Sequence, residues 1–357
     1  MTFAIAAAGT GGHVFPALSV ADALVELGAA PDEIMFLGGD RFEAQAVPDS
    51  GFPFKGYQLA RLRRAVSLEN LRIPMVVRRT AASMAGDLRM AASRVVLGMG
   101  GYVTVPASLA ARRAGLQFFL QEQNALPGLA TRFAARRALT TFLGLPGRAE
   151  RLPRSEIVGN PLRPAIAAAD REALRSDARS RYGVERAGTV VGILGGSLGA
   201  RVLNQAAPRI ARLGAVGAIV HLTGPDAFGE MSRIAGEAGV PWSCRPFEAE
   251  MEYFYAAADL VVCRAGAMTV SELAATGTPA VLVPLERVAQ QWNTRELSAA
   301  GGALVVRQGE LGRLPDLVGG LLGSPERLGR MSNAARAVGR PHAARIIARR
   351  LMEAAGG

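Results

Sequence analysis

Short apolar runs rich in β-branched residues recur along this chain, and most are followed by a turn and then by a helical pattern. The clearest run is Leu260–Cys263, whose four apolar residues suit a strand buried on both faces. Gly266 interrupts the pattern before a helical segment, which Gly277 and Pro279 end. Ala280–Val283 is apolar again, so the whole segment predicts a βαβ unit with two parallel strands.

The helix of this unit is expected to begin at a capping box, Thr269-Val-Ser-Glu272. A helix that begins at the carboxyl end of a strand directs unpaired N–H groups and the positive end of its dipole toward one place, which favours anions. Two interpretations of Glu272 stay open on this segment alone. Its carboxylate either caps the helix and needs no ligand, or it binds one.

The same alternation of strand and helix extends over both halves of the chain. Repeated β/α units of this kind predict an α/β fold with parallel sheets. The other expected strands are Phe3–Ala7, Ile34–Leu37, Phe54–Leu59, Val95–Leu97, Phe118–Leu120, Thr189–Leu194 and Ala218–Leu222. The other expected helices are Pro16–Leu27, one from near Pro106, one from Ala200, Phe228–Ala238, Glu248–Ala257, and a tail from Pro325 that is broken at Pro341.

Three glycine-rich loops each stand between an expected strand and an expected helix, at residues 9–13, 98–102 and 195–199. Glycines without Cβ atoms let the backbone approach a ligand closely. The alternative is a tight strand-to-helix turn without a ligand. The position of each loop, directly after a strand and before a helix, favours the ligand.

A stiff segment, Glu156–Pro164, predicts the boundary between two domains, because its prolines and glycine redirect the chain. The domains would then be residues 1–163 and 164–340. A length of 357 residues leaves room for two domains of about 100–200 residues each.

Composition narrows the class of protein. Half of the residues are hydrophobic and 20% are charged, which is typical of a globular chain. No run reaches the ~18 apolar residues of a membrane span, and the start lacks the basic region of a signal peptide. Cys244 and Cys263 are too far apart for a metal-binding pair, and a reducing cytoplasm suits them.

The formal charge of +11 comes almost entirely from arginine, because Lys55 is the only lysine. Such a balance indicates phosphate-bearing or membrane partners. Nucleic acid is not indicated, since aromatic residues make up only 6% of the chain and no nucleic-acid motif is present.

The segment Arg61–Arg79 mixes apolar and basic residues and has two interpretations. It is either a helix with a core face and a solvated basic face, or a segment that docks on an anionic membrane. Its basic residues are Arg61, Arg63, Arg64, Arg72, Arg78 and Arg79.

The motifs of both halves together resemble the MurG-type glycosyltransferases of family 28. They are G-T-G-G-H-x-x-P from Gly9, E-Q-N-x-x-P-G from Glu122, and R-x-G-A-x-T-V-S-E from Arg264. The resemblance implies a GT-B fold, in which two Rossmann-like domains have parallel sheets that face a cleft. It also implies that the last helix, about residues 341–357, returns to complete the first domain.

The reaction that this resemblance implies is an inverting transfer of GlcNAc from UDP-GlcNAc to lipid I, the undecaprenyl-pyrophosphoryl-MurNAc-pentapeptide. The C4 hydroxyl of the muramyl sugar attacks, and the product is lipid II for peptidoglycan synthesis. The enzyme would act as a peripheral protein at the cytoplasmic face of the plasma membrane. No cofactor or metal is expected, because the chain has no Asp-x-Asp pair.

The resemblance also implies which residues meet the substrates. Three departures from the family's pattern are Thr104 for a serine, Glu248 for an isoleucine and Ala289 for a histidine; at Glu248 only a backbone contact is expected. The substrate-binding residues would be Thr10, Gly11, Gly12, Asn124, Arg163, Ser197, Glu248, Glu272 and Gln290, with Gly100, Gly101 and Tyr102 on the acceptor side.

His13 is the candidate general base among three histidines, because it ends a glycine loop at a helix N-terminus. Such a place disfavours the imidazolium, and a neutral imidazole can take a proton from a sugar hydroxyl. The alternative is that His13 donates a hydrogen bond to the lipid pyrophosphate while a carboxylate acts as the base.

Competing functions are less consistent with the motifs. A dinucleotide-dependent oxidoreductase would need an acid about 20 residues after its glycine turn, but His221 and Thr223 stand there. A basic membrane-binding protein would leave three glycine loops unexplained. Other GT-B enzymes, such as diacylglycerol glucosyltransferases and sugar-nucleotide epimerases, share the architecture but not this combination of motifs.

Overall fold

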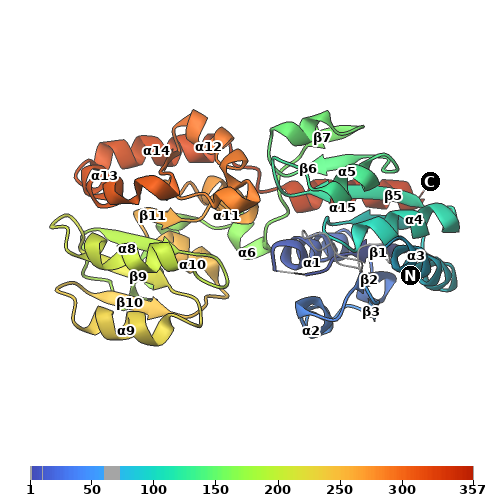
Figure 1. Ribbon diagram of the computed structural model, residues 1–357, viewed down its shortest axis with the longest axis horizontal. Helices are drawn as coiled ribbons and strands as arrows, with labels where there is room; N and C mark the ends of the chain where they lie inside the picture. Colours follow the sequence, from blue (N-terminus) through green and yellow to red (C-terminus); the bar gives the residue numbers. More distant parts are fainter. Residues whose placement is uncertain (1, 10, 60–72, 357) are drawn as a thin grey trace. The chain divides into compact units, whose positions relative to one another are not determined.

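The computed structural model describes residues 2–9, 11–59 and 73–356. The chain separates into two compact units (Figure 1). The first unit comprises Met1–Arg163 together with His342–Gly357, and the second comprises Pro164–Pro341. Thr10 and Arg61–Arg72, which contribute to the predicted site and to the basic segment, lie outside the described residues.

The first unit is built on a seven-stranded sheet with the order β3-β2-β1-β4-β5-β6-β7, and all of its described strand pairs are parallel. The strands are β1 Phe3–Ala6, β2 Ile34–Gly38, β3 Phe54–Gly56, β4 Val95–Gly98, β5 Gln117–Glu122, β6 Thr141–Leu143 and β7 Ser155–Ile157. Its helices are α1 Gly11–Glu26, α2 Phe42–Asp49, α3 Ile73–Met90, α4 Thr104–Ala114, α5 Leu129–Ala135 and α15 Ala343–Gly356.

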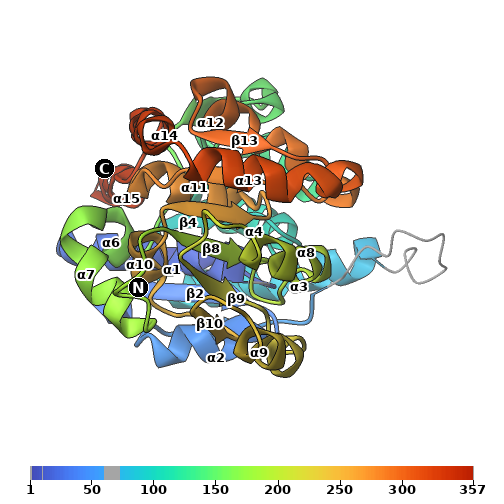
Figure 2. The ribbon, with the colours of Figure 1, turned by 90° about the vertical axis from the view of Figure 1, so that its left-hand side faces the viewer.

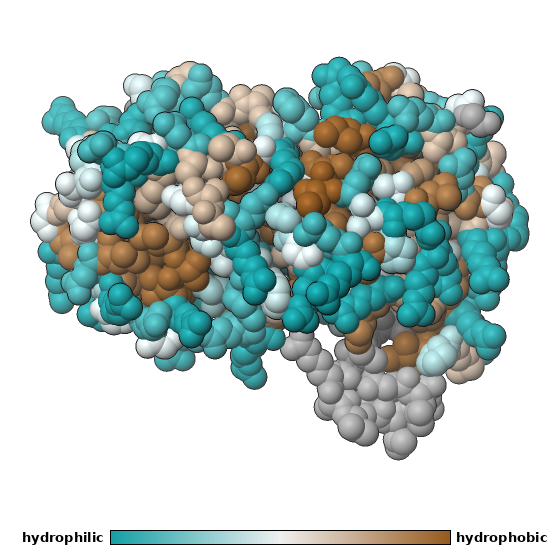
Figure 3. All heavy atoms as spheres, turned by 90° about the horizontal axis from the view of Figure 1, so that it is seen from above, coloured by the Kyte–Doolittle hydropathy of each residue, from teal (hydrophilic) through white to brown (hydrophobic). Residues whose placement is uncertain are grey.

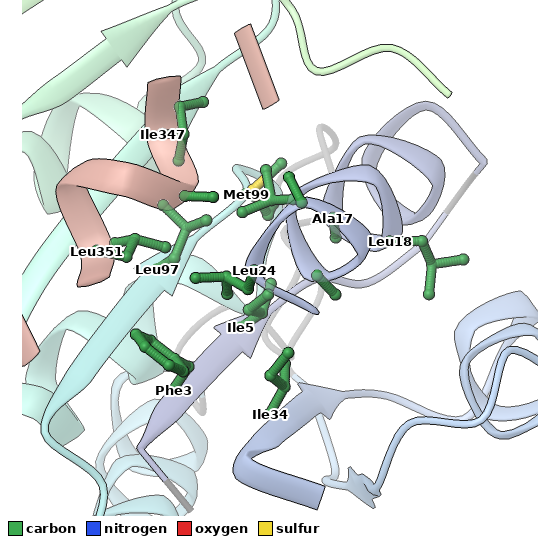
Figure 4. Close-up of a cluster of buried hydrophobic side chains, with 14 of the residues drawn as sticks. Phe3, Ile5, Ala17, Leu18, Leu24, Ile34, Leu97, Met99, Ile347 and Leu351 are labelled. Atoms are coloured by element: carbon green, nitrogen blue, oxygen red, sulfur yellow. The ribbon is translucent and has the colours of Figure 1, made fainter. Parts of the chain in front are cut away.

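Successive side chains of β1 point to opposite faces of the sheet and pack into two different cores, as a parallel sheet covered on both faces requires. Phe3 and Ile5 belong to the core that also contains α1 and α15, whereas Ala4 belongs to the core under α3 and α4. Figure 4 shows Leu351 of α15 beside Leu97, in a cluster that also contains Ile347, Phe3 and Ile5. The last helix therefore belongs to the first unit and contributes to its core.

The second unit repeats this plan with a six-stranded parallel sheet of the order β10-β9-β8-β11-β12-β13, which Figure 2 shows between helices. The strands are β8 Val190–Leu194, β9 Ala218–Leu222, β10 Trp242–Arg245, β11 Leu260–Cys263, β12 Ala280–Leu282 and β13 Ala303–Val305. The helices are α6 Pro164–Ala167, α7 Arg171–Arg181, α8 Arg201–Ala211, α9 Phe228–Gly236, α10 Met251–Ala257, α11 Ala267–Thr276, α12 Arg295–Ala300, α13 Leu314–Leu322 and α14 Pro325–Ala337.

Both sheets reverse their strand order at one point. In the first unit β1 lies between β2 and β4, and in the second unit β8 lies between β9 and β11. Loops on the two sides of such a point diverge, so ligands of open α/β sheets bind at the carboxyl ends of these strands. The three predicted glycine loops follow β1, β4 and β8.

Several boundaries differ from those expected. The helix α1 begins at Gly11 and not at Pro16, because the glycine loop itself forms the first helical turn. Glu156 and Ile157, expected in a linker, pair with β6 as part of the edge strand β7. The short strands β6, β7, β10 and β13 were not expected from the sequence, since runs of three or four residues carry little periodicity.

No described helix is long and apolar enough to cross a membrane. On the face in Figure 3, hydrophilic side chains cover much of the surface, and hydrophobic side chains gather in separate patches between them.

Candidate functional site

In the first unit, His13 lies in the first turn of α1 and reaches the end of β5. Its Nδ1 atom is 3.1 Å from Oε1 of Gln123. The other side of the Gln123 amide, Nε2, donates to the carbonyl oxygen of Met99 at 2.9 Å. Residues that follow β1, β4 and β5 are therefore joined by one polar chain at the carboxyl ends of neighbouring strands.

The second glycine loop lies against the imidazole ring. Gly100 and Gly101 have φ angles of +78° and +70°, which side chains rarely adopt. A Cβ atom on Gly100 would lie 3.4 Å from Cε1 of His13, and one on Gly101 would lie 3.5 Å from Cδ2. Thr104 stands where a serine was expected from the resemblance, and it keeps a hydroxyl group. This hydroxyl donates to the Gly100 carbonyl at 2.6 Å. Tyr102, also predicted on the acceptor side, is half exposed.

The first glycine loop is held by a buried carboxylate that the sequence reasoning missed. Glu43 of α2 is 1% exposed and accepts from the N–H groups of Gly9 and Gly39, each at 3.0 Å. Gly11 and Gly12 then form the start of α1, where N–H groups have no intrahelical acceptor and the helix dipole is positive. The start of α1 is therefore a position that favours an anion.

Asn124 and Arg163 occupy different parts of the first unit. Both the backbone N–H and the side chain of Asn124 donate to the buried Glu122, at 3.0 and 3.2 Å. The Arg163 guanidinium lies over the ring of Phe15, 5.3 Å from its centroid. Because Phe15 is in α1, this contact brings Arg163 to the same helix as His13.

In the second unit, the third glycine loop packs directly on the loop after β9. A Cβ atom on Gly199 would lie 2.0 Å from the Thr223 carbonyl oxygen, and one on Gly224 would lie 2.5 Å from the backbone of Leu198. Both glycines have positive φ angles, +74° and +81°. Ser197 lies in this loop and is exposed.

Glu272 does not belong to a capping box, so this prediction is wrong. Gly266 is the N-cap residue of α11 and the helix begins at Ala267, which puts Glu272 in the second turn. The helix starts earlier because Gly266, three residues after the end of β11, already has the extended backbone of an N-cap residue, with ψ of 143°. The Glu272 carboxylate instead accepts from the hydroxyl of Tyr255, a fully buried residue of α10, at 2.7 Å.

The predicted end of α11 is confirmed, because Gly277 has the left-handed conformation and caps the helix. Beyond β12, the side-chain oxygen of Gln290 accepts from the Leu285 N–H at 2.9 Å. This hydrogen bond joins the two ends of the loop at residues 285–290. Asn293 donates to the Ala265 carbonyl at 3.1 Å and ties this loop to the start of α11. Ala289 has a positive φ of 60°.

The side chain of Glu248 is fully engaged within the protein. Its oxygens accept from the Tyr182 hydroxyl at 2.8 Å and from the N–H of Glu250 at 3.0 Å, and it forms ion pairs with Arg181 and Arg245. Burial raises the pKa of this carboxyl group, but these donors outweigh burial, and the pKa lies below its ordinary 4.5. A ligand contact through the backbone of Glu248 stays a prediction.

The histidine and both cysteines of the second unit are buried or half-buried. His221 is fully buried, burial lowers its pKa to about 3, and its Nε2 lies 3.0 Å from Oδ1 of Asn204. Burial raises the pKa of Cys244 to about 11, and burial together with the charge of Glu272 raises that of Cys263. Within the described ranges, no cluster of histidine, cysteine and carboxylate side chains could hold a metal ion.

Comparison with known proteins identifies the family. Residues 3–143 match the N-terminal domain of glycosyltransferase family 28, and residues 190–347 match its C-terminal domain. The chain is 38% identical, over 97% of its length and 93% of the relative's, to an enzyme of Nocardia farcinica named UDP-N-acetylglucosamine–N-acetylmuramyl-(pentapeptide) pyrophosphoryl-undecaprenol N-acetylglucosamine transferase. The chain belongs to glycosyltransferase family 28.

Further relatives of this family 28 glycosyltransferase agree in sequence and fold. An enzyme of Halorhodospira halophila with the same name is 40% identical over 100% of this chain and 99% of its own. The crystal structure of Acinetobacter baumannii MurG has a TM-score of 0.76 and 27% identity, and the match covers 99% of this chain and 100% of that one. A UDP-GlcNAc 2-epimerase of Neisseria meningitidis, 15% identical with a TM-score of 0.67 over 99% and 100% of the two chains, shares the fold.

Proposed function

We propose that this glycosyltransferase transfers GlcNAc from UDP-GlcNAc to the C4 hydroxyl of the muramyl sugar of lipid I and so forms lipid II. The observation that carries the proposal is the similarity over nearly the full length to enzymes named for this transfer, at 38% and 40% identity. Membership of a glycosyltransferase family removes the oxidoreductase and the purely membrane-binding protein as alternatives.

The first unit is the proposed acceptor side. The N–H groups at the start of α1, from Gly11 and Gly12, suit the pyrophosphate of lipid I, because a helix N-terminus favours anions. Thr10 completes this loop in the sequence, and Gly100 and Gly101 lie against the His13 ring. Tyr102, which follows them in the chain, is a further proposed acceptor-side residue. Arg163 can bind two phosphate oxygens with its planar guanidinium.

The second unit is the proposed donor side. The loop with Ser197 and the start of α11 lie at the carboxyl ends of β8 and β11, where the strand order reverses. The Glu272 carboxylate would accept from ribose hydroxyls of UDP, while Gln290 would bind sugar hydroxyls. Asn124 of the first unit is the proposed sugar-nucleotide contact from the acceptor side.

In the proposed reaction, His13 takes the proton of the C4 hydroxyl while that oxygen bonds to the anomeric carbon of GlcNAc. The bond from this carbon to the β-phosphate oxygen breaks at the same time, and UDP leaves with the electron pair. Attack opposite the leaving group inverts the configuration. Helix N-terminal N–H groups stabilise the charge that develops on the diphosphate.

The test combines one enzyme with two substrate pairs. UDP-GlcNAc with a lipid I analogue should give lipid II, whereas UDP-glucose with diacylglycerol should give no product. His13→Ala should lower kcat by about 10²–10⁴-fold while the affinity for UDP-GlcNAc stays near that of the parent. A diacylglycerol glucoside would contradict the acceptor, and an unchanged kcat with a raised acceptor KM would assign His13 to pyrophosphate binding.

The proposed location is the cytoplasmic face of the plasma membrane, with peripheral attachment to anionic lipid. The formal charge of +11 supports this, as do exposed Arg78 and Arg79 of α3 beside Met75, which is 49% exposed. Each basic residue near such a surface contributes about 1 kcal/mol, so replacing both arginines by glutamine should weaken vesicle binding about 30-fold.

The matched control for this membrane test is the double variant Arg209→Gln, Arg212→Gln, which removes the same charge from exposed positions around the end of α8. It should bind phosphatidylglycerol vesicles as the parent does. Equal losses in both double variants would indicate that net charge, and not the surface of α3, controls binding.

A further inference from the structure

We infer that Gln123 is a positioning residue that holds His13 in the Nδ1–H tautomer and so leaves Nε2 as the nitrogen that accepts a proton. Its catalytic consequence rests on the proposed function, in which His13 is the base. The tautomer itself follows from the hydrogen bonds of the first unit alone.

The orientation of the Gln123 amide is decided by its second partner. Gln123 is 2% exposed, and its Nε2 lies 2.9 Å from the Met99 carbonyl oxygen. A carbonyl oxygen can only accept, so the NH₂ group must face Met99 and Oε1 must face His13. An amide oxygen also only accepts. The Nδ1 atom of His13, 3.1 Å away, therefore carries the hydrogen.

A neutral imidazole has one N–H group, so Nε2 of His13 keeps its lone pair. When Nε2 takes a proton, Nδ1–H continues to donate to Gln123, and the positive charge strengthens that bond. Proton transfer then requires no rotation of the ring and no exchange of partners. This is the arrangement that a general base needs.

The backbone of Gln123 is anchored as firmly as its side chain. Its carbonyl oxygen accepts from Nδ2 of Asn160 at 3.2 Å, and Oδ1 of Asn160 accepts from Gln121 at 2.9 Å. All three residues are at most 2% exposed. The imidazole also lies against Gly100 and Gly101, so the ring and its partner are both restrained.

Nuclear magnetic resonance of the full-length protein labelled with ¹⁵N-histidine tests the tautomer directly. The chain has three histidines, and His342 is exposed and can be assigned with His342→Gln. His221 is an internal reference with the opposite expectation: Nδ2 of Asn204 donates to the Thr223 carbonyl, so its Oδ1 requires Nε2–H on His221. A His13 signal of the Nε2–H form, or an average of both forms, would overturn the inference.

Variants connect the tautomer to activity. Gln123→Met keeps the volume but removes both hydrogen bonds, whereas Gln123→Glu keeps an acceptor for Nδ1–H. The first should lose the tautomer preference and lower kcat about 10–100-fold, within the range of general-base effects, with the UDP-GlcNAc KM unchanged. The second should keep the Nδ1–H form and more of the activity. Thr80→Val, which removes a hydrogen bond from a buried side chain elsewhere in the first unit, should leave the tautomer of His13 unchanged.

The outcomes separate two kinds of failure. If Gln123→Met leaves His13 in the Nδ1–H form, Gln123 does not position the ring and the inference is wrong. If Gln123→Met shifts the tautomer but leaves kcat unchanged, Gln123 does position the ring, but His13 is not the base. In that case kcat should also stay unchanged in His13→Ala. Parallel losses of activity in the methionine and glutamate variants, without a change of tautomer, would indicate a structural role only.

Discussion

Three individual buried carboxylates hold loops at the carboxyl ends of the two sheets. Glu43 accepts from two backbone N–H groups, Glu122 from Asn124, and Glu248 from a tyrosine, two arginines and a backbone N–H. A buried charge is costly unless it is paired and hydrogen-bonded. Each of these residues therefore stabilises one particular loop conformation.

Glu248→Gln should lower the free energy of unfolding at pH 7 by about 2 kcal/mol, because charge-assisted hydrogen bonds to Tyr182, Arg181 and Arg245 weaken. The folded pKa of Glu248 lies below 4.5, so its stabilisation is present above that pH and is lost as the pH falls through the folded pKa. Urea denaturation at several pH values should show the difference from the parent shrinking on acidification. Glu237→Gln, at an exposed pair, should change little at any pH.

Tyr255→Phe tests whether the hydroxyl of Tyr255 orients the Glu272 carboxylate for the ribose. Loss of one hydrogen bond of about 1–1.5 kcal/mol should weaken UDP binding roughly 5- to 15-fold in calorimetry, with little change in melting temperature. A UDP analogue with a 2′,3′-dideoxyribose should bind parent and variant alike. The same UDP affinity in both proteins would mean that Tyr255 only supports the core.

At the scale of elements, the last helix shows how an element distant in sequence completes a core. The helix α15 packs on α1 and β4, and Ile347 and Leu351 are at most 1% exposed there. Polar contacts add to this, because Arg94 donates to the Ala355 carbonyl at 2.7 Å. The N-terminal segment therefore has no complete core without the C-terminal end of the chain.

Leu351→Ala should lower the free energy of unfolding by about 2–5 kcal/mol, since it leaves a cavity between α15 and the sheet. Ile346→Ala on the same helix is the control, because Ile346 is 40% exposed and its loss should cost far less. Urea denaturation followed by circular dichroism measures both. Equal costs would show that α15 is held by its exposed face or by its polar contacts.

At the scale of the whole molecule, two units with separate cores share one chain. The second unit is a continuous segment, Pro164–Pro341, whereas the first is made of two segments. The core of the second unit contains residues of β8, α8, β11 and α13, and none of the described residues outside Pro164–Pro341 belongs to it. We therefore expect fragments of the two units to differ in whether they fold on their own.

A fragment of residues 164–341 should unfold cooperatively and bind UDP, because its core is complete. A fragment of residues 1–163 should not unfold cooperatively, because the surfaces that pack against Ile347 and Leu351 become exposed. Attaching residues 342–357 to that fragment through a flexible linker should restore cooperative unfolding. A stable 1–163 fragment without them would contradict the role given to α15.

The sequence by itself determined the features that depend on neighbouring residues. Short apolar runs rich in β-branched residues predicted most strands of both sheets, and Gly277 with Pro279 predicted the end of α11. Family motifs identified the first glycine loop. The E-Q-N-x-x-P-G motif contains Gln123, but nothing in it indicated that Gln123 is a partner of His13. Local signals were less reliable for helix starts: Pro16 and the Thr269–Glu272 spacing both suggested starts several residues too late.

Only the tertiary structure decided the features that join distant parts of the chain. His13 and Gln123 are 110 residues apart, and Gly9 and Glu43 are 34 residues apart. The sequence around one residue of each pair does not indicate its partner. The strands β6, β7 and β13 have three residues each and exist because neighbouring strands offer paired backbone groups. Hydrogen bonds across the sheet depend on strand order, which brings these side chains together and which no short stretch of sequence contains.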